Sequence, residues 1–184
     1  VGSGVAEVLS KNSQGIARRS GGEIQVKYIL DVRDFPDSPF KDCFVKDFSI
    51  IENDPEVDVV VETIGGAKVA LEFTTRALKA GKSVVSSNKE LVATHGYELL
   101  QLAKANGVSY LFEASVGGGI PILRPLTNCL AANEVEQITG ILNGTTNYIL
   151  TRMIKAGLTF EQALKEAQDN GYAEKDPTAD VDGH

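Results

Sequence analysis

The sequence predicts an α/β fold with a parallel β-sheet, and three observations support that prediction. Short runs rich in β-branched residues alternate with longer helical patterns, which is the arrangement of parallel strands joined by right-handed crossovers. Polar residues and glycines follow three of these runs, at the strand ends where open parallel sheets bind ligands. Glycine is also frequent, at 18 of 184 residues, and it gathers at those strand ends.

The first half of the chain shows the clearest alternation of strands and helices. Apolar residues at helical spacing predict a helix at the start of the chain, with one face formed by Val1, Val5, Val8 and Leu9. The elements expected next are a strand at 24–30, a proline-containing loop at 31–42, a strand at 57–62, a helix at 67–80 and a strand at 83–87. Asn88 is expected to cap a helix that extends to about Asn106, with Glu90 in its favourable first turn.

The pattern changes after a further expected strand at 108–114, and we place a domain boundary near Glu113. The elements expected beyond it are a helix from Pro121, a strand at 134–142, a polar turn at 143–146, and helices at 146–155 and 160–170. Thr159 and Gln162 have the spacing of a capping box at the start of the last helix.

Composition excludes several classes of function. The formal net charge of -7 makes the chain a poor candidate for binding nucleic-acid phosphates, which requires basic patches. No apolar run approaches the roughly 18 residues needed to span a bilayer, so no membrane partner is expected. The two cysteines, Cys43 and Cys129, lie too far apart in sequence to indicate a zinc pair or a disulfide framework.

The start of the chain resembles part of a dinucleotide-binding turn. Such a site consists of a strand, a glycine turn and a helix whose N-terminus faces the pyrophosphate. The chain begins Val1-Gly2-Ser3-Gly4 and continues as a helix, so Gly2 fits the third glycine of a G-x-G-x-x-G turn. The Rossmann-type sheet is therefore expected to lack its first strand in this chain. A frayed helix start is the alternative interpretation.

Charged residues follow the expected strand at 24–30. An acidic residue at this place binds a ribose hydroxyl, whereas an arginine accepts a 2′-phosphate. Asp31 and Arg33 offer both, so the choice between NAD and NADP stays open. A solvated charged turn is the alternative.

Polar residues at 62–66, 86–89 and 113–119 are expected to meet in one crevice, because the carboxyl ends of parallel strands lie at one edge of a sheet. Lys89 stands at a helix start, where the helix dipole disfavours a cation, so we expect it to meet an anionic cofactor or substrate. A solvent-facing lysine is the alternative. The carboxylate-rich stretch 171–182 is expected to be a loop that binds a substrate ammonium or hydroxyl, or else solvated surface.

Five stretches occur in the order typical of one enzyme family. They are E-T-I-G-G at 62–66, S-N-K-E-L at 87–91, F-E-A-S-V-G-G-G-I-P at 112–121, G-I-L-N-G-T-T-N-Y-I-L at 140–150, and the segment from Gly171 to Gly183. Through them the chain resembles the homoserine dehydrogenases over nearly its whole length. The resemblance implies NAD(P)-dependent interconversion of L-homoserine and L-aspartate 4-semialdehyde, in the biosynthesis of threonine, isoleucine and methionine.

The resemblance also implies an organisation. A Rossmann NAD(P)-binding domain would occupy 1–113, and part of a mixed α+β domain that binds homoserine and forms a homodimer would occupy 114–184. The location would be cytoplasmic, or a plastid if a transit peptide has been removed.

The resemblance assigns individual residues to three sites. The cofactor would contact Thr63, Ile64, Gly65, Ser87, Lys89, Gly171 and Glu174. The substrate would contact Glu174, Asp180, Gly144, Thr145 and Tyr172. A sodium ion would be held, mostly by backbone carbonyls, at Glu113, Val116, Gly118 and Ile120, which suits a hard cation.

The family places a substrate-binding aspartate and a proton-donating lysine just after the position of Gly183, and the sequence ends at His184. Lys89 is therefore the catalytic residue that we name here. We expect it to orient cofactor and substrate and to share the electrostatic work, with the family's other lysine as the main acid, and we expect the 184-residue chain by itself to be inactive. Two alternatives stay open. One is aspartate semialdehyde dehydrogenase, which needs a nucleophilic cysteine at a helix start. The other is a non-catalytic dinucleotide-binding module or regulatory subunit.

Overall fold

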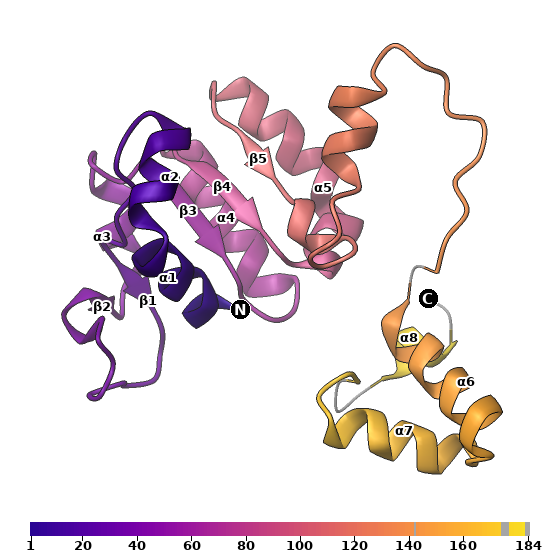
Figure 1. Ribbon diagram of the computed structural model, residues 1–184. Coiled ribbons are helices and arrows are strands. Elements are labelled where there is room, and N and C mark those ends of the chain that lie inside the picture. The colour runs from indigo at the N-terminus through magenta and orange to yellow at the C-terminus, as the bar shows by residue number, and fades with distance from the viewer. Residues whose placement is uncertain (142, 174–176, 183–184) are drawn as a thin grey trace. The chain divides into compact units, whose positions relative to one another are not determined.

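The computed structural model describes residues 1–141, 143–173 and 177–182, and the chain divides into two compact units, Val1–Ala131 and Ala132–His184 (Figure 1). All strands of the described residues lie in the first unit, whereas the second is helical. The domain boundary near Glu113 stays a prediction, because compactness alone does not define which residues share a function.

The first unit contains parallel strands, as the sequence predicts, but the described strands form two sheets where one was expected. β1 (Ile29–Leu30) pairs with β2 (Phe44–Val45). β4 (Ser83–Ser86) lies between β3 (Val59–Glu62) and β5 (Tyr110–Leu111), and both pairings are parallel. The predicted α/β class is therefore confirmed.

The helices of the first unit are α1 (Gly2–Lys11), α2 (Ser13–Ser20), α3 (Phe48–Asn53), α4 (Lys68–Lys79) and α5 (Lys89–Ala105). The expected cap of α5 is confirmed, since Asn88 Oδ1 accepts a hydrogen bond of 3.0 Å from Leu91 N. α4 buries residues four apart, Ala70, Thr74 and Leu78, which is one face of a helix. The two long helices therefore match their predicted positions closely.

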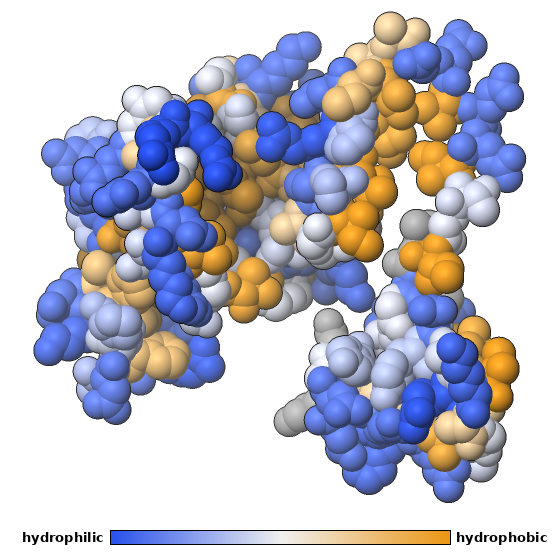
Figure 2. Space-filling view, in the orientation of Figure 1, coloured by the Kyte–Doolittle hydropathy of each residue, from blue (hydrophilic) through white to orange (hydrophobic). Residues whose placement is uncertain are grey.

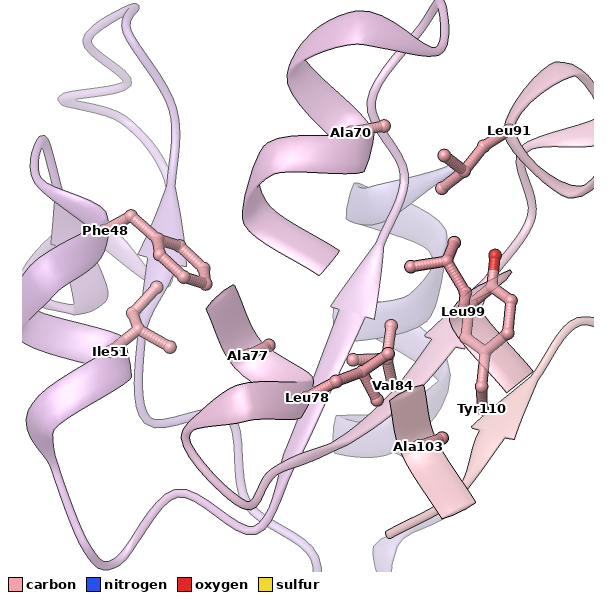
Figure 3. Close-up of a cluster of buried hydrophobic side chains, with 10 residues drawn as sticks. All are labelled: Phe48, Ile51, Ala70, Ala77, Leu78, Val84, Leu91, Leu99, Ala103 and Tyr110. Carbon is pink, nitrogen blue, oxygen red and sulfur yellow. The ribbon is translucent and has the colours of Figure 1, made fainter. Parts of the chain in front are cut away.

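The core of the first unit lies where α4 and α5 meet the sheet (Figure 3). Leu78, Leu91 and Val84 are fully buried there, and full burial of such a side chain is worth roughly 1.5–3 kcal/mol. The rings of Phe48 and Phe73 stack with centroids 4.6 Å apart, which attaches α3 to α4. This core fixes the position of the end of β3 relative to the end of β4.

Two predicted strands of the first unit are much shorter than expected, because a strand exists only where it has a partner, and one predicted helix differs in type. Of the expected strand at 24–30, only 29–30 pair, and of that at 108–114 only 110–111 pair. Glu113–Ser115 instead form the 3₁₀ turn η2. The expected helix from Pro121 becomes the π-helix η3 (Pro125–Cys129), preceded by two α-helical residues.

The segment between β1 and β3 contains elements that the sequence did not predict. The 3₁₀ turn η1 (Lys41–Cys43) ends the expected loop, and β2 and α3 follow it. Asp47 caps α3, since its carboxylate accepts a 2.8 Å hydrogen bond from Ser49 N. Phe48 and Ile51 on α3 are buried, so packing against the core stabilises these short elements.

The second unit consists of α6 (Gly144–Ala156), α7 (Phe160–Asp169) and the short α8 (Thr178–Asp182). The capping box of Thr159 and Gln162 is confirmed at the start of α7. Asn143 caps α6, with 2.9 Å between its Oδ1 and Thr146 N, so the expected turn at 143–146 is the first turn of this helix.

Two predictions for the second unit are wrong among the described residues. Residues 134–141 form no strand, because no described strand lies beside them. Residues 178–182 form α8 and not a loop, with Pro177 O accepting hydrogen bonds from the amides of Asp180 and Val181. Residues 142, 174–176 and 183–184 lie outside the described part.

Hydrophilic side chains cover much of the visible surface of each unit, with apolar patches between them (Figure 2). Among the described residues, no helix combines the length and the apolar character required to cross a membrane.

Candidate functional site

The ends of β3 and β4 carry a buried polar cluster. Glu62 and Ser86 are register partners on the two strands, with exposed fractions of 4% and 0%. Glu62 Oε2 accepts a 2.5 Å hydrogen bond from Ser86 Oγ, and Glu62 Oε1 accepts one of 2.6 Å from Ile64 N. Ser86 Oγ in turn accepts a 3.1 Å hydrogen bond from Asn88 N. The cluster thus joins the turn after β3 to the start of α5.

The side chain of Asn88 also connects the turn after β3 to the start of α5. Its Nδ2 donates to Ile64 O at 2.9 Å and to Gly66 O at 2.8 Å. Gly66 has a φ of 78°, a conformation that favours glycine and lets the turn close in this way. Asn88 therefore fixes the 63–66 turn while it caps α5.

The predicted cofactor residues of the first unit come together at this edge. Ile64 and Gly65 belong to the turn that Asn88 holds. Ser87 N donates to Glu62 O at 3.3 Å and so continues the pairing of β3 with β4. Lys89 is the first residue of α5 and its side chain is exposed. Residues from two predicted strand ends thus form one site.

Gly2 lies against the same turn. A Cβ atom built on Gly2 would be 3.1 Å from Thr63 Oγ1, so the start of α1 contacts the residue that follows β3. Figure 1 shows the start of the chain beside the end of β3. The backbone N–H groups at the N-termini of helices favour anions such as phosphates. The assignment of Gly2 as the third glycine of a dinucleotide turn stays a prediction.

Asp31 and Arg33 form a bidentate ion pair just after β1. Arg33 Nη2 lies 2.9 Å from Asp31 Oδ2, and Arg33 Nε lies 3.1 Å from Asp31 Oδ1. The Arg33 guanidinium and the Arg33 backbone N–H together lower the pKa of Asp31 to about 2. The two residues that could select between NAD and NADP therefore engage each other.

Glu113, which the resemblance assigns to a sodium site, uses its carboxylate for backbone hydrogen bonds. The Glu113 carboxylate accepts backbone hydrogen bonds from Ile122 (2.6 Å), Leu123 (3.0 Å) and Arg124 (2.7 Å), and it thereby caps the helical segment that contains η3. These bonds, that of Ile122 first, lower the pKa of Glu113. Three backbone amides thus engage the carboxylate, and the assignment of this loop to a sodium ion stays a prediction.

The loop after Glu113 brings the backbone oxygen of Ile120 close to Gly117. Gly117 and Gly118 have φ of 74° and 59°, and a Cβ on Gly117 would lie 3.0 Å from Ile120 O. Val116 and Gly118 lie on the same loop. Over the described ranges, no group of three His, Cys, Asp or Glu side chains could hold a metal.

The predicted substrate residues of the second unit also lie together. Thr145 Oγ1 donates to Tyr172 O at 2.9 Å, and Asn143 Nδ2 donates to Asp180 Oδ1 at 2.9 Å. Gly144 and Tyr172 line a shallow hollow with Asn147, Tyr148 and Thr151. The structure therefore brings Gly144, Thr145, Tyr172 and Asp180 into one region, whereas Glu174 lies outside the described residues.

Gly171 adopts a φ of 74° at the end of α7, where its amide donates to Gln168 O at 3.0 Å. It ends the helix directly before Tyr172 and so directs the chain back toward α6.

Two contributors were not singled out from the sequence. Glu62 was grouped with the polar strand end, and its burial became visible only in the structure. Asn143 was assigned to a turn, although an asparagine before a helical pattern is itself a capping signal.

Comparisons with known proteins give one family model for the part of the chain that contains the polar cluster of the first unit and another for the part that contains the predicted substrate residues. The family model described as "Homoserine dehydrogenase, NAD binding domain" matches residues 1–113, and the model described as "Homoserine dehydrogenase" matches residues 121–184. The homoserine dehydrogenase of Bacillus subtilis is 44% identical over 188 residues, and that of Pseudomonas aeruginosa is 45% identical over 185. Each match covers the whole chain but only 43% and 42% of the respective relative, so the chain spans less than half of their length.

Solved structures give the same result. A homoserine dehydrogenase from Thiobacillus denitrificans is 42% identical, with a TM-score of 0.89, over 98% of this chain and 42% of that protein. A hyperthermophilic archaeal homoserine dehydrogenase in complex with NADPH is 30% identical, with a TM-score of 0.83, over 100% of this chain and 62% of that protein.

Proposed function

Because this chain belongs to the homoserine dehydrogenase family, we propose that it contributes the dinucleotide site and part of the substrate site of an enzyme that interconverts L-homoserine and L-aspartate 4-semialdehyde with NAD(P). This reaction would supply the biosynthesis of threonine, isoleucine and methionine. The single observation that carries the proposal is the junction at the ends of β3 and β4, with Gly2 against Thr63.

The dinucleotide would bind at that junction. Its pyrophosphate would lie at the start of α1, which approaches the 63–66 turn closely because Gly2 carries no side chain. The residues that would contact it are Thr63, Ile64, Gly65, Ser87 and Lys89, with Gly171 and Glu174 from the second unit. When bound, NAD(P) accepts or donates the hydride, and the protein positions the reactants and stabilises charge.

Lys89 would act on the oxygen of the reacting carbon. In the reductive direction that oxygen gains negative charge as the carbonyl is reduced, and a nearby ammonium stabilises the charge. In the oxidative direction the hydride would pass to NAD(P)⁺ and the hydroxyl proton to the lysine that the family places after the position of Gly183, while the Lys89 ammonium stabilises the negative charge on the oxygen. Homoserine would be held by Asp180, Gly144, Thr145, Tyr172 and Glu174.

The choice of cofactor would depend on the Asp31–Arg33 pair. Arg33 can meet a 2′-phosphate only if it gives up at least part of its bidentate contact with Asp31. The archaeal relative was solved with NADPH, which supports NADP as one of the cofactors of this chain.

We also propose a sodium site and a dimeric assembly. The sodium ion would be bound mostly through the backbone oxygens of Glu113, Val116, Gly118 and Ile120, since three backbone amides already engage the Glu113 carboxylate. The enzyme would be a cytoplasmic homodimer, with domains at 1–113 and 114–184.

An initial-rate assay of the full-length protein tests the proposal. Reduced nicotinamide should form with L-homoserine and NAD(P)⁺, and it should be consumed with L-aspartate 4-semialdehyde. Cofactor binding without turnover would indicate a non-catalytic dinucleotide module. Phosphate-dependent aldehyde oxidation would indicate aspartate semialdehyde dehydrogenase. The two cysteines do not favour the latter, since Cys43 ends η1 and Cys129 ends η3, and neither lies at a helix start.

A further inference from the structure

Glu62 is an acidic residue in a buried position. It ends β3 with an exposed fraction of 4%, whereas carboxylates are almost never fully buried unless they are paired. Both carboxylate oxygens act as acceptors, Oε1 from Ile64 N at 2.6 Å and Oε2 from Ser86 Oγ at 2.5 Å. Burial of such a group is stable only because both acceptors are used.

We propose that Glu62 is a positioning residue for the dinucleotide: its buried carboxylate fixes the 63–66 turn and, through Ser86, the start of α5. This inference rests on the proposed function. Ile64 N is a backbone donor of the turn itself, so the bond to Oε1 sets the path of the chain directly after β3. Ser86 passes the constraint on, because its Oγ accepts from Asn88 N at 3.1 Å.

The cluster reaches two segments that would bind the cofactor. Asn88 precedes Lys89 and donates to the carbonyls of Ile64 and Gly66, so a shift of the turn would move both segments. Preorganised groups of this kind lower the cost of ordering a binding site when the ligand arrives. Loss of Glu62 is therefore expected to weaken cofactor binding more than it slows the chemical step.

The neighbourhood of the cluster explains how a glutamine would behave at position 62. Glutamine has one acceptor oxygen and one donating NH₂ group, so it cannot accept from both Ile64 N and Ser86 Oγ. The Ser86 hydroxyl would have to turn toward another acceptor. Tyr110 offers one, because Ser86 is the hydrogen-bonding side chain beside its buried hydroxyl, whose pKa is raised by burial. In Figure 3 the hydroxyl of Tyr110 lies at the end of its ring nearer to Leu91, in α5.

A matched control lies at the opposite ends of the same two strands. Lys82, just before β4, is also 4% exposed, and its Nζ donates to Asp54 O at 2.6 Å and to Val57 O at 3.0 Å. It ties the residues that precede β3 to β4, far along the strands from the 63–66 turn. Lys82→Met removes a buried charge and its hydrogen bonds without touching the cluster of Glu62.

The experiment measures NADPH dissociation constants and steady-state constants of the full-length enzyme and of Glu62→Gln, Glu62→Ala, Ser86→Ala and Lys82→Met. We expect the NADPH Kd and the cofactor KM to rise about tenfold in Glu62→Gln and Ser86→Ala, and further in Glu62→Ala. The homoserine KM and kcat at saturating cofactor should change by less than about threefold. Lys82→Met should lower the Tm and leave the NADPH Kd within about twofold.

Folded Glu62→Gln and Ser86→Ala enzymes with the wild-type NADPH Kd would overturn the inference and leave the proposed function intact. The inference is also overturned if Lys82→Met weakens NADPH binding as much as Glu62→Gln and Ser86→Ala do. The weaker binding would then follow from lower stability alone. Should Glu62→Ala not fold, the glutamine and serine variants decide the question. A wild-type enzyme that neither binds NADPH nor oxidises homoserine would overturn both proposals.

Discussion

Gly2 and Thr63 are in contact where α1 begins and β3 ends, and a Cβ on Gly2 would lie 3.1 Å from Thr63 Oγ1. Substitution of Gly2 by valine should therefore push the start of α1 away from the turn. We expect Gly2→Val to raise the cofactor KM by about tenfold or more, because the phosphate-binding end of the helix would shift. Gly4 is the matched control in the same helical turn, since a Cβ there meets nothing within 4 Å. An equal effect of Gly4→Val would contradict this explanation.

Arg33 should control the preference for NADP over NAD. Its guanidinium is the group that could accept a 2′-phosphate, and glutamine cannot supply the charge. We predict that Arg33→Gln raises the KM for NADP about tenfold and leaves the KM for NAD within about twofold. Arg19, exposed on α2, serves as the control for loss of a surface arginine. The idea fails if the ratio of the two kcat/KM values stays unchanged.

Lys89→Ala should lower kcat/KM for homoserine by about 100-fold, because the cation that stabilises charge on the reacting oxygen would be lost. Lys104→Ala is the control at the other end of α5, where a lysine only complements the helix dipole. Initial rates at saturating cofactor separate the two variants. A Lys89→Ala enzyme with nearly wild-type kcat/KM would remove this residue from the mechanism.

Asn143 should influence the substrate site, because it caps α6 and also donates to Asp180 Oδ1. Asn143→Ala loses both functions, whereas Thr159→Ala loses only the cap of α7. Each substitution should cost about 1 kcal/mol of stability. Only Asn143→Ala is expected to raise the homoserine KM, by about fivefold, with the cofactor KM unchanged. Equal homoserine KM values in the two variants would show that the hydrogen bond from Asn143 to Asp180 has no separate effect on substrate binding.

Because the pKa of Asp54 is lowered in the folded protein, we expect protonation of this carboxylate to reduce the stability of the protein in acid. Lys27, at 2.6 Å, contributes most to lowering the pKa of Asp54 to about 2, and the hydrogen bonds from Glu56 N and Tyr28 add to it. A folded-state pKa below the unfolded value of about 3.9 means that this stabilisation is complete above pH of about 4 and is lost toward pH of about 2. The stability difference between wild type and Asp54→Asn should shrink in that window and stay constant from about pH 5 to 7. Urea unfolding followed by circular dichroism at each pH measures it, and a constant difference down to the acid limit would refute the assignment.

The helices were predictable because their signals are local. Asn88, Thr159 and the periodic apolar faces define α4, α5 and α7 to within two residues. The strands were predicted too long at 24–30 and 108–114, since pairing depends on a neighbour that the sequence does not identify.

The sequence predicts which residues belong to the candidate site, but it does not predict which of them contact one another. The sequence indicated Asp31, Arg33 and Glu113, but it could not show that the first two pair with each other or that the third caps a helical segment. Partner choice of this kind depends on three-dimensional proximity. The buried role of Glu62 was hidden for the same reason.

We propose that this site transfers a hydride between homoserine and a nicotinamide. To test this, the full-length enzyme is incubated with NADP⁺ and L-homoserine deuterated at C4, the carbon that carries the reacting hydroxyl, and the mass of the reduced cofactor is determined. We expect NADPH that contains one deuterium at the reduced position of the ring, together with deuterated aspartate 4-semialdehyde. Reduced cofactor without deuterium, or no reduced cofactor from an enzyme that binds NADP⁺, would contradict it.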